Sequence, residues 1–146
     1  MLSNTCKYAL RALIYLSKYP ADGRIGIKQI SEDLKISSAF LGKILQGLTR
    51  QKLLISSKGP NGGFALAKKP EKISLWNVVV IVDGEDYFTN CLVGMKPCKT
   101  HDTSKLLCPV HFKYNKLREK IITFYKNTSL KNVSEDITRF EELMEL

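Results

Sequence analysis

The chain has 146 residues, of which 44% are hydrophobic and 25% are charged. This length excludes a large multidomain enzyme and suits one compact unit, or two small units that share a core. No stretch approaches the roughly 18 consecutive apolar residues of a membrane helix, and Lys7, Arg11 and Lys18 interrupt the N-terminal region where a signal peptide is apolar. We therefore expect a cytoplasmic protein with no membrane partner.

The formal charge of +9 belongs entirely to the first half of the chain. Residues 1–72 contain thirteen Lys and Arg against four Asp and Glu, whereas the remaining residues contain ten of each sign. This asymmetry predicts a surface that binds a polyanion, and it favours nucleic acid over an anionic membrane because no amphipathic anchor is present. A solvated lysine-rich surface would give the same charge split, so charge alone does not identify the partner.

The first fifty residues predict three helices. Residues 2–19 repeat apolar side chains at helical spacing, and Pro20 ends the pattern. A second, shorter helix is expected at about 27–35. A serine at 37 or 38 can cap a third helix that extends to about Arg50. The apolar stripe of this third helix consists of Phe40, Leu41, Ile44, Leu45 and Leu48.

Two short apolar runs then flank a segment rich in turn-forming residues. Residues 53–55 and 64–67 are expected to be strands, and the glycine-rich segment 56–63 to be the basic tip of their β-hairpin. Two helices joined by a tight turn and followed by such a hairpin form a winged helix-turn-helix. The expected fold is therefore mainly α with a small β-hairpin wing, followed by a long dimerisation helix.

The next segments are less regular. Residues 74–82 contain the β-branched run Val78 to Val82, which favours a strand, but Ser74 as a cap and Gly84 as a terminator favour a short buried helix. We favour the helix. Residues 85–108 show no periodicity and contain three of the four cysteines, so we expect a loop that is too long to be a simple connection.

A long helix is expected from Pro109 to about Lys126, with an apolar stripe that could pack on a partner or on the chain's own core. We favour a homodimer, because a palindromic DNA site is matched by a twofold-symmetric protein. The apolar stripe of the long helix consists of Val110, Leu117, Ile121 and Phe124. The amphipathic tail, 130–146, is expected to pack on the dimer. The expected division is 1–73 for DNA binding, 74–108 for a connecting helix and sensor loop, and 109–146 for dimerisation.

A helix that enters the major groove presents short side chains at its N-terminal turn, together with basic groups for phosphate. Each such residue, taken singly, could equally be a helix cap or an ordinary surface residue. Within this arrangement, we predict contacts to double-stranded DNA from Ser37, Ser38, Ala39, Gly42 and Lys43. Further contacts are predicted from Lys28 and from the wing, at Lys58, Asn61 and Gly62, with Lys68 and Lys69 also able to reach phosphates.

The cysteine loop has the composition of a soft-metal or iron–sulfur site. Cys91, Cys98 and Cys108 supply three thiolates, and such a site usually has four ligands. His111 is the predicted fourth ligand, with His101, Cys6 or an acidic group from the other subunit as alternatives. The spacing, with six and then nine intervening residues, matches neither the tight cysteine pairs of zinc ribbons nor the cysteine runs of ferredoxins. A structural zinc site, or cysteines with no ligand, are the alternatives.

The sequence does not support catalysis. It contains no serine elbow, no phosphate-cradling glycine motif and no obvious carboxylate pair, so we expect a protein that is not an enzyme. The alternative from another class is a thiol-redox protein whose basic half binds an acidic protein. The sequence contains no Cys-x-x-Cys motif that would support this alternative.

Four segments together resemble the Rrf2 family of bacterial regulators: 6–13, 30–37, 40–48 and the Gly-Pro-x-Gly-Gly-aromatic wing at 58–64. The resemblance implies dimeric winged-helix repressors or activators. In many members it also implies an iron–sulfur cluster on three loop cysteines, here Cys91, Cys98 and Cys108 with His111 beside them. A [2Fe–2S] cluster is favoured over [4Fe–4S], sensing redox state, nitric oxide or iron–sulfur status. The alternative is a member without a cluster that receives its signal from a protein partner.

Overall fold

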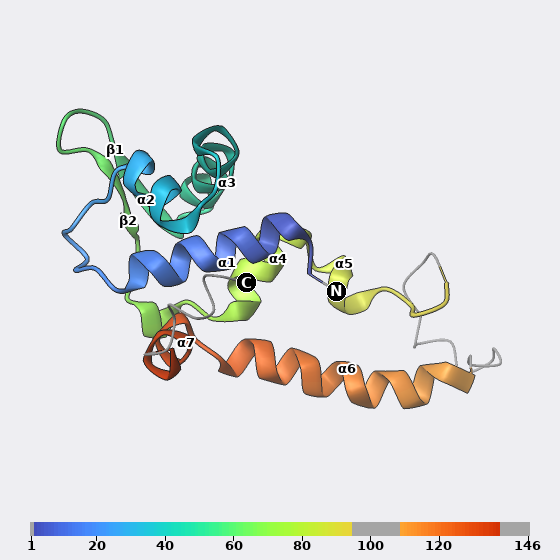
Figure 1. Cartoon of the computed structure of the whole chain (residues 1–146). Coiled ribbons are helices and arrows are strands. Elements are labelled where there is room, and N and C mark those ends of the chain that lie inside the picture. The colour runs from blue at the N-terminus through green and yellow to red at the C-terminus, as the bar shows by residue number, and fades with distance from the viewer. Residues whose placement is uncertain (1, 95–108, 138–146) are drawn as a thin grey trace.

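The computed structural model describes residues 2–94 and 109–137. Most of this chain is helical, and an antiparallel two-stranded hairpin projects beside the helices (Figure 1). The expected fold class, mainly α with a small β wing, is confirmed. In chain order the elements are α1 (Asn4–Ser17), α2 (Ile27–Leu34), α3 (Ser38–Arg50), β1 (Leu54–Ser57), β2 (Gly63–Leu66), the 3-10 helix η1 (Pro70–Lys72), α4 (Leu75–Asp83), α5 (Asp86–Thr89), α6 (Pro109–Asn127) and α7 (Leu130–Asp136).

The helix-turn-helix consists of α2 and α3, which pack on α1. At the end of α2, Lys35 adopts a left-handed backbone (φ 54°), which turns the chain sharply, and Ile36 is buried beneath the turn. The Ser37 hydroxyl then caps α3 by accepting a hydrogen bond from the N–H of Phe40 at 3.4 Å. The apolar faces of the three helices meet in one core, which includes Leu13, Ile30, Leu41, Leu45 and Leu48.

A short backbone pairing ties the wing to this core. β1 and β2 pair with Ser57 opposite Gly63. The next residue, Phe64, exchanges two backbone hydrogen bonds with Ile25, at 2.9 and 3.0 Å. A Cβ atom at Gly63 would lie 2.3 Å from the carbonyl oxygen of Ile25, and its φ is +149°. This close approach of two backbones therefore requires glycine.

The ambiguous segment 74–82 is helical, as favoured. Ser74 and Asn77 form a reciprocal capping box at the start of α4, and Gly84 (φ 86°) follows its last turn. Val78 is fully buried in the core. The cap and the burial of this face together outweigh the strand propensity of the valine run.

The expectation of an irregular segment from residue 85 is wrong at its beginning, where the chain forms α5. The α5 residue Phe88 is buried, and its ring stacks on Trp76 of α4 with 4.3 Å between the ring centres. Tyr125 of α6 meets the same ring edge-to-face at 5.3 Å. This aromatic contact, which the periodicity of so short a helix could not reveal, joins α4, α5 and α6.

The long helix α6 runs along one side of the molecule, and α7 turns back against α1 (Figure 1). Leu130 of α7 is fully buried in the core shared with α1, and Val133 packs against that core. The described part of the tail therefore packs on its own chain. The rest of the expected tail, 138–146, lies outside the described residues.

The segments that lead into α4 and into α7 pair with each other. The N–H of Leu75 donates to the carbonyl oxygen of Thr128 at 2.9 Å, and the N–H of Leu130 donates to that of Ile73 at 2.8 Å. Ser74 thereby lies opposite Ser129. This backbone clasp fixes the C-terminal end of α6 to the core.

Candidate DNA interface and sensor pocket

One face of α3 is exposed along its whole length. Ala39 and Lys43, both predicted DNA contacts, lie on this face together with Gln46 and Arg50. The steps of four, three and four residues place these side chains on one side of the helix. The sequence prediction missed Gln46 and Arg50, although the same spacing extended from Ala39 would have found them.

The expected apolar stripe of α3 is only partly buried. Leu41, Ile44, Leu45 and Leu48 are buried, but Phe40 is 37% exposed. Its ring contacts Tyr8 of α1 edge-to-face, with 5.5 Å between the ring centres. Phe40 therefore lies at the edge of the core, although it belongs to the same apolar stripe.

Three other predicted contacts at the start of α3 also hold the helix-turn-helix together. Ser37 caps α3, and the Ser38 hydroxyl donates to the Ser31 hydroxyl of α2 at 2.8 Å. A Cβ atom at Gly42 would lie 3.2 Å from Cδ1 of Ile27, so glycine allows α2 and α3 to approach closely. Both serines are exposed. A role of these residues in contacting DNA stays a prediction.

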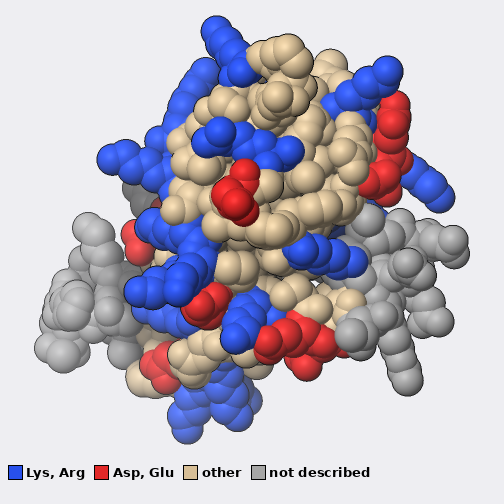
Figure 2. Space-filling model, turned by 90° about the vertical axis from the view of Figure 1, so that its left-hand side faces the viewer, with Lys and Arg blue, Asp and Glu red and all other residues tan. Residues whose placement is uncertain are grey.

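The wing presents its tip to solvent. Lys58 and Asn61 are exposed, as is Lys28 on α2. A Cβ atom at Gly62 would lie 2.4 Å from the carbonyl oxygen of Ser57, so this tight turn requires glycine. Seen from the wing end of the molecule, Figure 2 shows Lys and Arg side chains over much of the surface, with Asp and Glu in smaller groups. This face has the charge expected of a surface that contacts phosphates.

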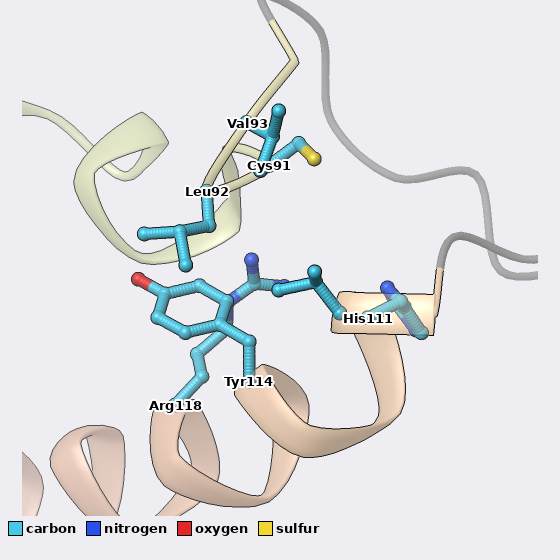
Figure 3. Close-up of a pocket in the computed structure, with 7 residues that line it drawn as sticks. Cys91, Leu92, Val93, His111, Tyr114 and Arg118 are labelled. Carbon is cyan, nitrogen blue, oxygen red and sulfur yellow. The ribbon is translucent and has the colours of Figure 1, made fainter.

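At the far end of the molecule, the structure brings Cys91 and His111 together in one pocket. Cys91, Leu92 and Val93, which follow α5, line this pocket together with His111, Tyr114 and Arg118 of α6 (Figure 3). His111 is 9% exposed. The other two predicted ligands, Cys98 and Cys108, and the alternative His101, lie outside the described residues. Within residues 2–94 and 109–137, no three potential metal ligands gather at one point.

Cys6, the alternative fourth ligand, belongs to the hydrophobic core. It is fully buried in a cluster with Val79 and Phe88. Burial, with the nearby Asp83 carboxylate as a further cause, raises the pKa of the Cys6 thiol to about 12. A buried, protonated thiol is a poor metal ligand, because thiolates bind metals.

This pKa predicts how stability depends on alkaline pH. Between pH 9 and about 12, the thiol ionises in the unfolded chain but stays protonated in the folded one. The unfolded state then binds fewer protons, so the free energy of unfolding falls as pH rises. We expect the free energy of unfolding to fall less in Cys6→Ala than in the wild type between about pH 8 and pH 10.5. Urea unfolding measures this, with each protein referred to its own value at pH 8. Equal falls in the two proteins would contradict a raised pKa of the Cys6 thiol.

The chain is a winged helix-turn-helix protein. Its three N-terminal helices pack together, α3 is the exposed second helix of the helix-turn-helix, and the hairpin is held by the backbone bonds to Ile25. The Rrf2 family model, described as an iron-dependent transcriptional regulator, matches residues 2–136. The chain belongs to the Rrf2 family of transcriptional regulators, in agreement with the resemblance of its motifs.

Individual relatives agree with this membership. A protein of Aquifex aeolicus, assigned as an HTH-type transcriptional regulator, is 34% identical over 91% of this chain and 90% of its own. The regulator IscR of Yersinia enterocolitica is 30% identical over 88% of this chain and 76% of its own. All of these relatives are regulators, and no enzymatic family is indicated.

Solved structures share the fold. CymR, the global cysteine regulator of B. subtilis, superposes with a TM-score of 0.78 at 18% identity and covers 92% of this chain and 96% of its own. T. potens IscR gives a TM-score of 0.73 at 17% identity and covers 95% and 89%. Within the described ranges, no helix has the length and apolarity needed to cross a bilayer.

Proposed function

We propose that the protein is a homodimeric regulator that binds a double-stranded DNA operator and senses its signal through an iron–sulfur cluster. The observation that carries the DNA part is the exposed face of α3, where Lys43 and Arg50 lie beside Ala39 and Gln46. Short and amide side chains can approach base edges, and the cations can bind phosphate or guanine. The wing around Lys58 contacts the flanking DNA. In this proposal, residues 1–73 read DNA, 74–108 sense and 109–146 pair the subunits.

The dimer is supported by the exposure of the apolar stripe of α6, of which one residue packs on the chain itself and three face solvent. Ile121 packs on the chain's own aromatic cluster. Val110, Leu117 and Phe124 are 39%, 53% and 58% exposed. These three residues recur every seven positions and so form a narrow seam, which is the pattern of a helix that packs on a second helix. A second copy of the chain is the partner that also matches a twofold DNA site.

The cluster is supported by the pocket at the sensor end. A thiol from Cys91 and an imidazole from His111 line this pocket together with the cationic side chain of Arg118. Cysteine and histidine are both side chains that bind iron–sulfur groups. In the proposal, Cys91, Cys98, Cys108 and His111 hold a [2Fe–2S] cluster. Bound there, it would supply a centre that responds to redox state, nitric oxide or iron–sulfur supply. Iron and sulfide analysis after anaerobic purification tests this part, and the absence of both would reject it.

The salt dependence of operator binding tests the DNA part. If each subunit neutralises about four phosphates, log K should fall with log salt with a slope near −7. Lys43→Ala should weaken binding and reduce that slope by about 2, since each of two subunits loses one contact. Fluorescence anisotropy with a fragment of the protein's own promoter would measure both.

Lys131→Ala is the matched control, because Lys131 is an exposed lysine of α7 whose ion pair with Glu135 is local. We expect it to bind like the wild type. Equal affinity of the wild type for promoter and random DNA would contradict the regulator proposal, and so would a Lys43→Ala variant with unchanged affinity and slope.

A further inference from the structure

A groove lies between α3, the start of α1 and the end of α4. Its volume of about 280 Å³ is close to that of the smaller sites that bind small molecules. The apolar part of its lining comes from Ile44 and Leu48 of α3, which are buried, and from Ile81 and Val82 of α4, which are partly buried. The polar part of the lining consists of the side chains of Thr5, Lys43, Arg50 and Gln51.

The charge of this groove is positive. Lys43 and Arg50 line it, and no aspartate or glutamate is among its lining residues. Within residues 2–94 and 109–137, neither cation forms an ion pair. Two such cations attract an anion, and an arginine can hold a carboxylate through two parallel hydrogen bonds. A bare inorganic ion would leave the apolar lining in contact with water, so the ligand that fits also has an apolar body.

Gly47 keeps this groove open. It lies in the interior of α3, where glycine is less favourable than alanine. A Cβ atom at this position would meet no atom within 4 Å, so no contact in the described part of the chain requires glycine. Gly47 also lines the groove, and a longer side chain there would extend into its volume. The glycine thus preserves space that the described residues leave empty.

We propose that this groove binds a small carboxylate with an apolar body, such as a medium-chain or aryl-substituted carboxylic acid. The carboxylate pairs with Lys43 and Arg50, and the body covers the apolar lining. The same two cations lie on the face of α3 assigned to DNA, so a bound carboxylate takes their charge from the phosphates. Ligand and operator therefore weaken each other, and this coupling is reciprocal. The coupling rests on the proposed function, whereas the binding site does not.

Calorimetric titration of the full-length, DNA-free protein with octanoate tests the binding site. Acetate has the charge of octanoate without its apolar body, and octanol has the body without the charge. We expect octanoate to bind one molecule per chain. Acetate and octanol should each bind about 10-fold more weakly or less, because each loses one half of the interaction.

Three variants show whether octanoate occupies this groove. Gly47→Met fills the groove and should abolish octanoate binding, and Arg50→Gln should weaken it about 10-fold or more. Lys28→Gln is the matched control, because Lys28 is an exposed, predicted DNA contact that does not line the groove. It should weaken operator binding but bind octanoate like the wild type. Circular dichroism confirms that each variant is folded, and if Gly47→Met is not, the result is read from Arg50→Gln.

Octanoate that binds no more tightly than acetate or octanol overturns the site, and so does equal octanoate affinity of Arg50→Gln and Lys28→Gln. The absence of octanoate binding, as expected if a second copy of the chain covered the groove, also overturns it. Operator anisotropy then tests the coupling, with a several-fold weaker apparent affinity expected in saturating octanoate. Octanoate that binds without changing operator affinity overturns the coupling alone, and a wild type that binds no operator overturns the proposed function while the site stands.

Discussion

Replacing Leu117 with glutamate is expected to leave the chain folded but monomeric, and to lower its affinity for a two-half-site operator by about 10²- to 10⁴-fold. Leu117 is the middle residue of the exposed seam on α6 and is 53% exposed in the single chain, so a charge there is tolerated by the monomer. In a dimer, the same charge would be buried against its own copy without a partner. Each head would then bind DNA alone and lose the advantage of a linked second site.

Sedimentation velocity gives the mass of the particle, and anisotropy gives the affinity. Thr123→Glu is the matched control, because Thr123 is exposed on the same helix and lies on the other side from the seam. It should remain dimeric. A Leu117→Glu protein that sediments as a dimer would show that another surface joins the subunits.

The second large effect is expected at Gly63. Gly63→Ala places a Cβ atom 2.3 Å from the carbonyl oxygen of Ile25, in a backbone conformation that side chains rarely adopt. Strain of about 1–3 kcal/mol and the loss of two hydrogen bonds worth about 0.5–1.5 kcal/mol each should lower the free energy of unfolding by about 2–6 kcal/mol. The wing would also separate from Ile25, which should weaken DNA binding beyond the loss of stability.

Gly47→Ala provides the comparison, since no atom lies within 4 Å of its added Cβ. In the interior of α3, this change should raise stability by about 0.5–1 kcal/mol. Urea unfolding of the two variants measures both effects. A Gly63→Ala variant as stable as the wild type would mean that the wing and Ile25 can separate at little cost.

Local signals were enough to predict most elements. The spacing of apolar residues gave the three N-terminal helices, and the glycine-rich tip gave the hairpin. The choice of a helix over a strand for segment 74–82 depended on the cap residue Ser74, which is visible in the sequence, although the propensity of the valine run favoured a strand. Capping and turn residues act over three or four positions, so a sequence displays them directly.

Features that depend on distant contacts were missed. Phe40 shares the spacing of the buried stripe, but only its contact with Tyr8 shows that it lies at the edge of the core. The helix α5 is too short for periodicity and depends on Phe88 packing against Trp76. Arg118 reaches Asn90 across 28 residues, and no local pattern predicts that bond.

The backbone pairing of Ser74 with Ser129 places the two ends of the intervening segment side by side. The segment after Ser74 begins, and the segment before Ser129 ends, at neighbouring points, held by the bonds from Leu75 to Thr128 and from Leu130 to Ile73. Segments whose ends lie side by side tolerate insertion and exchange, because their contents do not alter the path of the host chain. An insertion after α4 is therefore expected to leave the path of residues 2–74 unchanged, whereas exchange of the whole segment would also remove Leu75 and Val78 from the core.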